Sequence, residues 1–147
     1  MNIEIHSFKK EHLQEVLTLH SNNYEGWGVK GLVNDIANPN TESYVAIIDK
    51  EIVGFCSYLV GDDAQLNYVC TKKTKHRLGI ASNLLSSTIS NLDVDSIVLE
   101  VRSQNISAIS LYEKLNFKKL GVRKNLYSFP SDDGIVMEYT KKEKFIW

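Results

Sequence analysis

Several features are scarce in this chain of 147 residues, and each scarcity argues against a class of protein. The formal net charge is -1, so no overall basic field favours binding to nucleic acid. No apolar run approaches the roughly 20 residues that span a bilayer, and the polar start Met1–Glu4 is not typical of a signal peptide. We therefore expect a cytoplasmic protein that binds neither a membrane nor nucleic acid directly.

Cysteines and metal-binding patterns are also sparse. Cys56 and Cys70 lie apart inside apolar segments, which predicts reduced, buried thiols rather than a disulfide or a nucleophile. The histidines show no metal-ligand spacing, and we expect His6, His12 and His20 to be surface or packing residues. No Gly-Lys-Ser/Thr triplet follows a glycine loop, which disfavours an ATP or GTP site. The sequence thus predicts no metal.

The remaining composition is that of a globular protein, with 43% hydrophobic and 24% charged residues. The length suits one domain, residues 1–147, that can bury a substantial core. Apolar periodicity predicts alternating strands and helices. Strands are expected at 3–8, 44–48, 52–60, 64–71, 96–102, about 117–127 and 134–140, and helices at about 13–20, 29–37, 80–92 and 105–115.

The order of these elements indicates the fold class. Four strands form an antiparallel meander, and two strand-helix units follow, which is typical of an α/β or α+β protein with a mixed, mostly antiparallel sheet of about seven strands flanked by four helices. The helix between the fourth and fifth strands requires a crossover connection. Those two strands should therefore be parallel.

The most informative segment is the turn Arg77–Ala81, which joins a strand-like segment to a helix-like one. A small-residue turn of this kind lets backbone N–H groups approach a phosphate, and the helix N-terminus adds partial positive charge. Further cationic residues precede it: Lys72, Lys73, Lys75 and His76. The pattern predicts a site for a phosphorylated ligand, although the same small residues would also pack a helix tightly on a strand.

A second motif lies downstream. The strand-like segment Ile97–Arg102 is interrupted by one carboxylate, Glu100, and Asn105 opens a helix that carries Leu111–Phe117. Together with Arg77–Ala81, these segments resemble the GNAT superfamily of acetyl-CoA-dependent N-acetyltransferases. They are most similar to the branch of that superfamily that acetylates the N-terminal alanine of ribosomal proteins.

The resemblance covers roughly residues 2–140 and includes several departures. The segments Val122–Tyr127 and Asp133–Met137 match the final strand pair of the family. The departures are His76 in place of Gln or Arg, Lys72–Lys73 in place of Asp-Pro, Asn116 in place of Gly, and Leu126 in place of a frequent Tyr. The first two bear on cofactor affinity, and the last bears on substrate choice.

The resemblance implies the GNAT fold, with a parallel strand pair that splays apart to admit the pantetheine arm of acetyl-CoA. It also implies that backbone N–H groups of the fourth strand polarise the thioester carbonyl, and that the pyrophosphate lies on the turn. The residues expected to bind acetyl-CoA are Val69, Cys70, Thr71, His76, Arg77, Leu78, Gly79, Ile80, Ala81, Ser82, Asn105 and Tyr112. Asn105 should in addition cap its helix.

Acetyl transfer to an amine needs a base and an acid. A carboxylate on an apolar strand is desolvated, which would raise the pKa of Glu100, but Glu100 could instead pair with Arg102 on the same strand face. The Tyr112 hydroxyl could protonate the departing thiolate, or Tyr112 could be core packing. The resemblance implies that Glu100 is the base and Tyr112 the acid.

The acceptor is an amine of a protein or of a small molecule. An α-amino group has a pKa near ~7.7–8.0 and a lysine near ~10.4, so an N-terminal amine needs less help from a base. The resemblance frames the acceptor with Tyr24, Glu25, Trp27, Tyr127, Asp132 and Asp133. Aromatic walls and acidic rims suit a basic protein N-terminus. Alternatively, Trp27 packs under a helix and the Asp pair makes a turn.

The sequence therefore predicts an enzyme that transfers the acetyl group of acetyl-CoA to the N-terminal α-amine of a protein, with a ribosomal protein as the expected partner. A monomer or weak dimer is expected. Two alternatives stay open: a small-molecule amine acetyltransferase, and a non-catalytic module that binds acyl-CoA.

Overall fold

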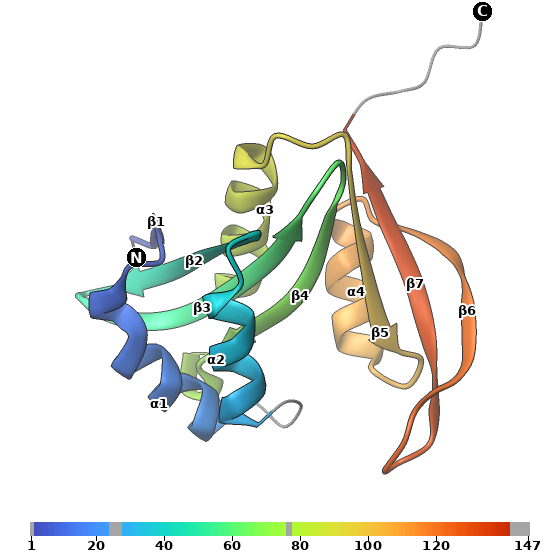
Figure 1. Cartoon of the computed structure of the whole chain (residues 1–147), viewed down its shortest axis with the longest axis horizontal. Helices are drawn as coiled ribbons and strands as arrows, with labels where there is room; N and C mark the ends of the chain where they lie inside the picture. The colour runs from blue at the N-terminus through green and yellow to red at the C-terminus, as the bar shows by residue number, and fades with distance from the viewer. Residues whose placement is uncertain (1, 24–27, 76–77, 142–147) are drawn as a thin grey trace, which may run out of the picture. The chain divides into compact units, whose positions relative to one another are not determined.

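The computed structural model describes residues 2–23, 28–75 and 78–141, which contain seven strands and four α-helices (Figure 1). Two short 3-10 helices, at 10–12 and 73–75, complete them. In chain order the elements are β1 Glu4–Ser7, α1 Leu13–Asn23, α2 Val29–Ala37, β2 Thr41–Ile48, β3 Glu51–Val60, β4 Ala64–Thr71, α3 Ile80–Asn91, β5 Ser96–Arg102, α4 Ile106–Lys114, β6 Lys118–Tyr127 and β7 Asp132–Thr140.

Most element bounds agree with the sequence prediction. Helix 29–37 and strands 64–71 and 96–102 are confirmed residue for residue. The strand predicted from 44 begins earlier, at Thr41, because Thr41 is paired with Leu59 of β3. Backbone pairing with β3 thus extends beyond the apolar residues 44–48.

The sheet has the strand order β1-β2-β3-β4-β5-β7-β6. Strand β1 is antiparallel to β2, and β2 to β3. Strands β4 and β5 are parallel, with Ala64 opposite Ile97 and Gln65 opposite Val98. Strand β7 is antiparallel to both β5 and β6. The predicted mixed sheet and its parallel pair are therefore confirmed.

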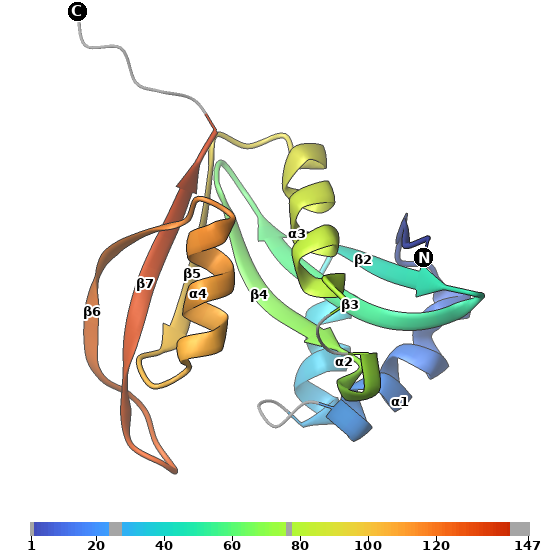
Figure 2. The ribbon, with the colours of Figure 1, turned by 180° about the vertical axis from the view of Figure 1, so that it is seen from behind.

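Residues 1–61 and 66–92 form one compact unit, and residues 62–65 and 93–147 form a second. In the first unit, α1 and α2 lie on one face of the strands and α3 lies on the other (Figures 1 and 2). A Cβ atom at Gly54 of β3 would lie 3.1 Å from Cγ2 of Ile80 and 3.3 Å from Cβ of Ala46. The missing side chain thus lets α3 pack closely on β3.

The turn between β2 and β3 consists of Asp49 and Lys50, with φ of 49° and 68°. Positive φ at both central residues is the type I′ geometry, whose twist matches that of antiparallel strands. Aspartate tolerates this conformation better than most side chains. The tight turn predicted at these two residues is confirmed.

In the second unit, α4 covers one face of β5, β7 and β6 (Figure 2). The Oδ1 atom of Asn105 accepts a hydrogen bond from the Ala108 amide at 3.2 Å, which confirms the predicted helix cap. Asn116, directly after the C-cap of α4, has a φ of 73°. Asparagine is the side chain that best replaces glycine in this left-handed conformation. The departure at Asn116 is therefore compatible with the fold.

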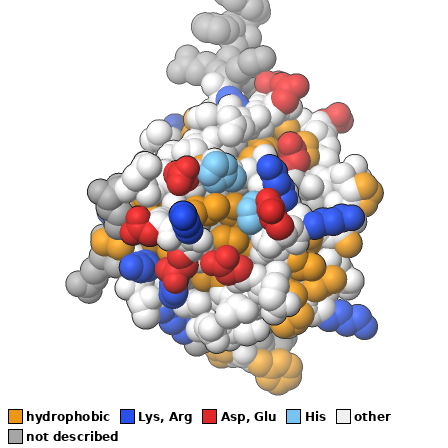
Figure 3. Space-filling model, turned by 90° about the vertical axis from the view of Figure 1, so that its left-hand side faces the viewer, with side chains coloured by type: hydrophobic (Ala, Val, Ile, Leu, Met, Phe, Trp, Pro, Cys, Tyr) orange, Lys and Arg blue, Asp and Glu red, His pale blue; other side chains and the backbone are white. Residues whose placement is uncertain are grey.

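Figure 3 shows a face on which acidic and basic side chains alternate without forming a large area of one sign. Cys56 and Cys70 are free and buried, as predicted, and burial raises the pKa of the Cys56 thiol to about 12. In the ranges that the structure describes, no His, Cys, Asp and Glu side chains form a group of three able to hold a metal ion. The helices of those ranges are also too short or too polar to cross a membrane.

Candidate active site

The turn before α3 has the backbone geometry expected of a phosphate site. Gly79 is the N-cap of α3 and has a φ of 72°, and a Cβ atom there would meet nothing within 4 Å. The buried side chain of Ile80 anchors the helix, whereas Leu78 is exposed. The first N–H groups of an α-helix have no intrahelical acceptor and carry partial positive charge. The backbone of the turn is therefore compatible with a bound pyrophosphate. His76 and Arg77, which are also expected to bind acetyl-CoA, lie outside the described residues.

The end of β4 carries three further residues expected to bind acetyl-CoA. Val69 and Thr71 are partly exposed, whereas Cys70 is buried. Burial raises the pKa of the Cys70 thiol, so Cys70 is not a poised nucleophile. Lys72 donates to Glu51 at 2.7 Å and lowers the pKa of that carboxyl group. Part of the positive charge before the turn is thus held in an ion pair.

Two hydrogen bonds join the last turn of α1 to β4 and to the segment after it. Nδ1 of His20 lies 2.6 Å from the Tyr68 hydroxyl, and both side chains are buried. Oδ1 of Asn23 accepts from the Lys73 amide at 2.7 Å. The prediction of a packing role for His20 is confirmed. The contact of Asn23 is not indicated by any pattern in the sequence. Three of the expected acceptor residues, Tyr24, Glu25 and Trp27, lie outside the described residues.

The partner of Glu100 is Arg123 of β6. Nη1 of Arg123 lies 3.1 Å from Oε1 and 3.0 Å from Oε2 of Glu100. The Glu100 side chain is 28% exposed and that of Arg123 is 58% exposed. The alternative considered from the sequence, an ion pair with Arg102, is therefore wrong in its partner. Arg102 shares a strand face with Glu100, as expected, but it is engaged elsewhere.

Arg102 holds the connection between β6 and β7. Its Nη1 donates to the Pro130 carbonyl at 2.8 Å, and its Nη2 to the Ser128 carbonyl at 3.4 Å. Its guanidinium also lies 4.4 Å from the centre of the Tyr127 ring. Burial and the negative charge of Glu100 raise the pKa of Tyr127. Tyr127, an expected acceptor residue, thus lies close to the ion pair of Glu100 and Arg123.

Asp132 and Asp133, the expected acidic rim, hold backbone and side chains in place. The Asp132 carboxylate accepts from the Ser103 hydroxyl, from the Gln104 amide at 3.2 Å and from the Asp133 amide at 2.7 Å. These contacts, with the Ser103 hydroxyl first, lower the pKa of Asp132. Asp133 accepts from the Asn125 amide at 2.9 Å. These bonds support the alternative in which the pair stabilises a turn.

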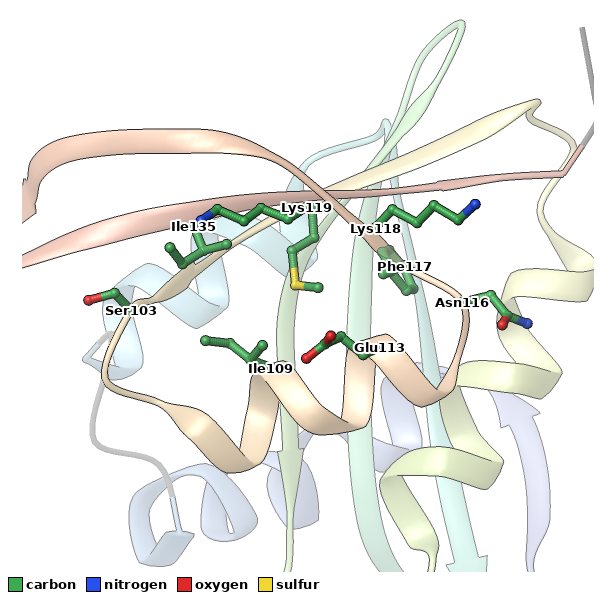
Figure 4. A pocket seen from close by; sticks show the side chains of 9 residues that line it. Ser103, Ile109, Glu113, Asn116, Phe117, Lys118, Lys119 and Ile135 are labelled. Atoms are coloured by element: carbon green, nitrogen blue, oxygen red, sulfur yellow. The ribbon is translucent and has the colours of Figure 1, made fainter.

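A cavity of about 480 Å³ lies between α4 and strands β6 and β7 (Figure 4). Ile109 and Glu113 project into it from α4. The other lining residues are Ser103, Asn116, Phe117, Lys118, Lys119, Ile135 and Met137. None of these residues belongs to the predicted site, and all of them lie in the second unit.

The cavity shows which way Glu100 points. Ile135 and Met137 of β7 line it with Ile109 of α4, so α4 covers the sheet face to which they point. Val136 pairs with Glu100 in the register of β5 and β7 and lies between Ile135 and Met137 in the sequence. Its side chain points to the opposite face, because side chains alternate along a strand. Glu100 therefore lies on the sheet face that α4 does not cover.

Tyr112 lies on the side of the sheet that α4 covers. It is a buried residue of α4, and its ring centre lies 5.8 Å from that of Phe117. The predicted base and the predicted acid are thus on opposite sides of the strands of the second unit. Packing between aromatic rings, the alternative considered for Tyr112, is present in the structure.

The amino-acid sequence of the chain matches a known protein family. The model of the acetyltransferase (GNAT) domain matches residues 5–127. The chain belongs to the GNAT acetyltransferase family. It is therefore an N-acetyltransferase with acetyl-CoA as the acetyl donor, as the sequence predicted.

Two curated relatives and one solved structure show the range of similarity. A Bacillus subtilis protein described as a candidate ribosomal protein bS18-alanine N-acetyltransferase is 30% identical over 112 residues, 74% of each chain. An N-alpha-acetyltransferase of Saccharolobus solfataricus is 34% identical, over 60% of this chain and 64% of its own length. The crystal structure of the ribosomal-protein-S18-alanine N-acetyltransferase from Escherichia coli matches with a TM-score of 0.89 at 23% identity, covering 98% of this chain and 97% of its own. That last likeness confirms the predicted fold.

Proposed function

We propose that this enzyme acetylates the N-terminal α-amine of a protein, with a ribosomal protein as the substrate. The observation that carries the proposal is the similarity to the Bacillus subtilis protein described above, which extends over 74% of both chains. The Saccharolobus relative, also described as acting on an α-amine, supports the same acceptor class. Because new ribosomal proteins are made in the cytoplasm, we propose that location too, and we propose residues 1–147 as a single acetyltransferase domain.

Acetyl-CoA supplies the acetyl group as a thioester. The N–H groups of Arg77–Ser82, at the turn and the start of α3, are proposed to hold its pyrophosphate, and the open space around Gly79 supports this. The N–H groups of Val69–Thr71 are proposed to polarise the thioester carbonyl. Asn105 is proposed to contact the cofactor in addition to capping α4.

Glu100 is proposed as the base. One of its carboxylate oxygens takes a proton from the acceptor nitrogen as that nitrogen bonds to the acetyl carbon. Its partial exposure on the sheet face opposite α4 supports access by a polypeptide. An N-terminal amine suits a carboxylate base because its pKa, near ~7.7–8.0, lies far below that of lysine.

Tyr112 is proposed as the acid. Its hydroxyl gives a proton to the sulfur as the carbon–sulfur bond breaks, and the phenolate then regains a proton from solvent. Base and acid on opposite sides of β5 and β7 would let the amine arrive and the thiol leave on different sides. The acceptor residues Tyr127, Asp132 and Asp133, together with Tyr24, Glu25 and Trp27, remain part of this proposal.

A substrate panel tests the proposed acceptor. Release of CoA is measured with acetyl-CoA and, separately, peptides with a free N-terminus, the same peptides with a blocked N-terminus, free lysine and a polyamine. We expect turnover of the free peptides and an acetyl group at the α-amine by mass spectrometry. Better turnover of the polyamine would favour a small-molecule acetyltransferase, and binding of acetyl-CoA without turnover of any acceptor would favour a non-catalytic module.

A further inference from the structure

We propose that Arg123 is a positioning residue that fixes the carboxylate of Glu100 in the orientation needed to take the amine proton. This inference rests on the proposed role of Glu100 as the base. Arg123 itself needs no contact with the acceptor or with acetyl-CoA. Its effect on turnover passes through Glu100.

The geometry of the contact suits an orienting role. A single nitrogen, Nη1 of Arg123, lies within 3.1 Å of both carboxylate oxygens of Glu100, so rotation of the carboxylate breaks at least one contact. Each carboxylate oxygen has two lone pairs. One donor shared by both oxygens leaves a lone pair on each for an amine or a bridging water. Arg123 can therefore stay in place while Glu100 accepts the proton.

The strand order explains why Arg123 can reach Glu100. Strand β7 lies between β5 and β6, and it pairs Glu100 with Val136 and Arg123 with Gly134. Glu100, Val136, Gly134 and Arg123 therefore point to the same sheet face. The side chain of Leu126 fills the space where a Cβ atom of Gly134 would lie. The long side chain of Arg123 reaches across β7 to the Glu100 carboxylate. The ion pair joins the edge strand to β5.

Arg102 cannot take this role, although it is nearer to Glu100 in the sequence. Its guanidinium donates to the carbonyl groups of Ser128 and Pro130 and covers the ring of Tyr127. Arg102 therefore shapes the connection after β6, and Arg123 is left to orient Glu100. The ion pair with Glu100 that was considered for Arg102 is made by Arg123.

The exposure of the pair sets the size of the expected effect. With the Arg123 side chain 58% exposed and the Glu100 side chain 28% exposed, water competes for the ion pair. Exposed ion pairs of this kind contribute little free energy, which corresponds to about a two- to fivefold change in a rate. We expect a kcat loss of that size for Arg123→Gln, with unchanged KM for acetyl-CoA and for a peptide with a free N-terminus.

The matched control is Lys118→Ala. Lys118 is an exposed cation on the same strand, and in Figure 4 its amine points away from the cavity that its side chain borders. The Lys118→Ala substitution also removes one positive charge from β6 but leaves the contact between Arg123 and Glu100 in place, so kcat should not change. Arg123→Lys keeps a cation that can donate to the carboxylate and should recover most of the lost turnover. A lower peptide KM with unchanged kcat in Arg123→Gln would mean that Arg123 competes with the acceptor and would overturn the proposal.

A double-mutant cycle separates positioning from general support of the fold. In a Glu100→Gln background, Arg123→Gln should cause no further loss in single-turnover rate, because there is no carboxylate to orient. An equal loss in both backgrounds would overturn the inference while leaving Glu100 as the base. If Glu100→Gln alone leaves the rate unchanged, the proposed base itself is wrong, and this inference falls with it.

Discussion

The side-chain oxygen of Asn23 accepts a hydrogen bond from the backbone amide of Lys73, at 2.7 Å. Asn23 is the last residue of α1, and its amide nitrogen also donates to the Leu19 carbonyl at 2.8 Å. Lys73 follows β4 at the start of the segment that leads to the turn before α3. One side chain thus joins the end of α1 to the segment that follows β4.

We expect Asn23→Ala to raise the KM for acetyl-CoA and for peptide together, because both segments lose a common support. A lost hydrogen bond of this kind costs about 0.5–1.5 kcal/mol, which is roughly a two- to tenfold change. Steady-state kinetics with each substrate varied in turn measures both constants.

The control for this change is Asn23→Asp, which keeps the oxygen that accepts from Lys73 and should retain most of the affinity. Asn22→Ala, at an exposed neighbouring position, should behave as the unchanged protein. A rise in only one of the two KM values in Asn23→Ala would contradict a shared support.

Gly79 offers a test of the cofactor turn. Acetyl-CoA should raise the melting temperature of the protein, because a ligand that binds only the folded state stabilises it, whereas ATP and NAD should not. We expect Gly79→Val to abolish this shift. The φ of 72° is costly for a β-branched residue, so the turn must change its backbone, although a Cβ atom itself would meet no neighbour.

Gly79→Asn is the matched variant, because asparagine tolerates a positive φ. It should keep more of the acetyl-CoA shift than Gly79→Val does. If both variants keep the full shift in a thermal melt, the phosphates bind elsewhere.

The element order and the family motifs could be predicted from sequence because each depends on local patterns. The turn before α3 combines a glycine with the start of an amphipathic segment, and helix 29–37 ends before Asn38–Pro39 as the restriction on residues before proline requires. Asn105 is a cap residue at the start of an apolar helix, and its contact with Ala108 involves residues only three apart. The cap of α4 and the end of helix 29–37 both depend on residues only a few positions apart in the sequence.

The partners of the charged residues could not be predicted in the same way. Arg102 lies two residues from Glu100, and the local pattern therefore indicates a pair between them. The true partner, Arg123, is 23 residues away and depends on β7 lying between β5 and β6. Strand order is a long-range property, and the alternation of β6 alone does not identify the strand that its side chains reach.

Asp132 gives a prediction on acid stability. Its pKa is lowered in the folded protein, chiefly by the Ser103 hydroxyl, so folding favours the ionised form. The resulting stability is present above the ordinary pKa of an aspartate, near ~3.9, and is lost as the pH falls through the lowered value. We expect Asp132→Ala to lower the urea midpoint at pH 7, and the difference from the unchanged protein to shrink below about pH 4.

Asp93→Ala, at an exposed position between α3 and β5, should leave the urea midpoint at pH 7 unchanged. A deficit of Asp132→Ala that is constant from pH 7 to pH 3 would show that lost packing, rather than the carboxylate, is responsible. The same hydrogen bonds mean that charge reversal at Asp132 is expected to disturb the β6–β7 connection as well as any preference for basic peptides.

Glu100→Gln should lower kcat by roughly 10²- to 10⁴-fold if Glu100 is the base. The loss should be largest at low pH, where more of the acceptor is protonated and proton removal matters most. A pH series of initial rates with one peptide measures this. A loss that is small and equal at every pH would mean that positioning of the two substrates carries the rate without a base at Glu100.

Tyr112→Phe tests the acid while keeping the aromatic packing. The ring of Tyr112 lies against Phe117, and a phenylalanine occupies nearly the same volume, so the melting temperature and the acetyl-CoA shift should stay close to their original values. Turnover should fall, by up to the roughly 10²- to 10⁴-fold that a general acid contributes. Tyr139→Phe is the control, because Tyr139 packs against the same ring, with its ring centre 5.7 Å from that of Phe117. If both variants lose turnover equally, the loss comes from the aromatic cluster, and if Tyr112→Phe keeps full turnover, the sulfur receives its proton from another donor.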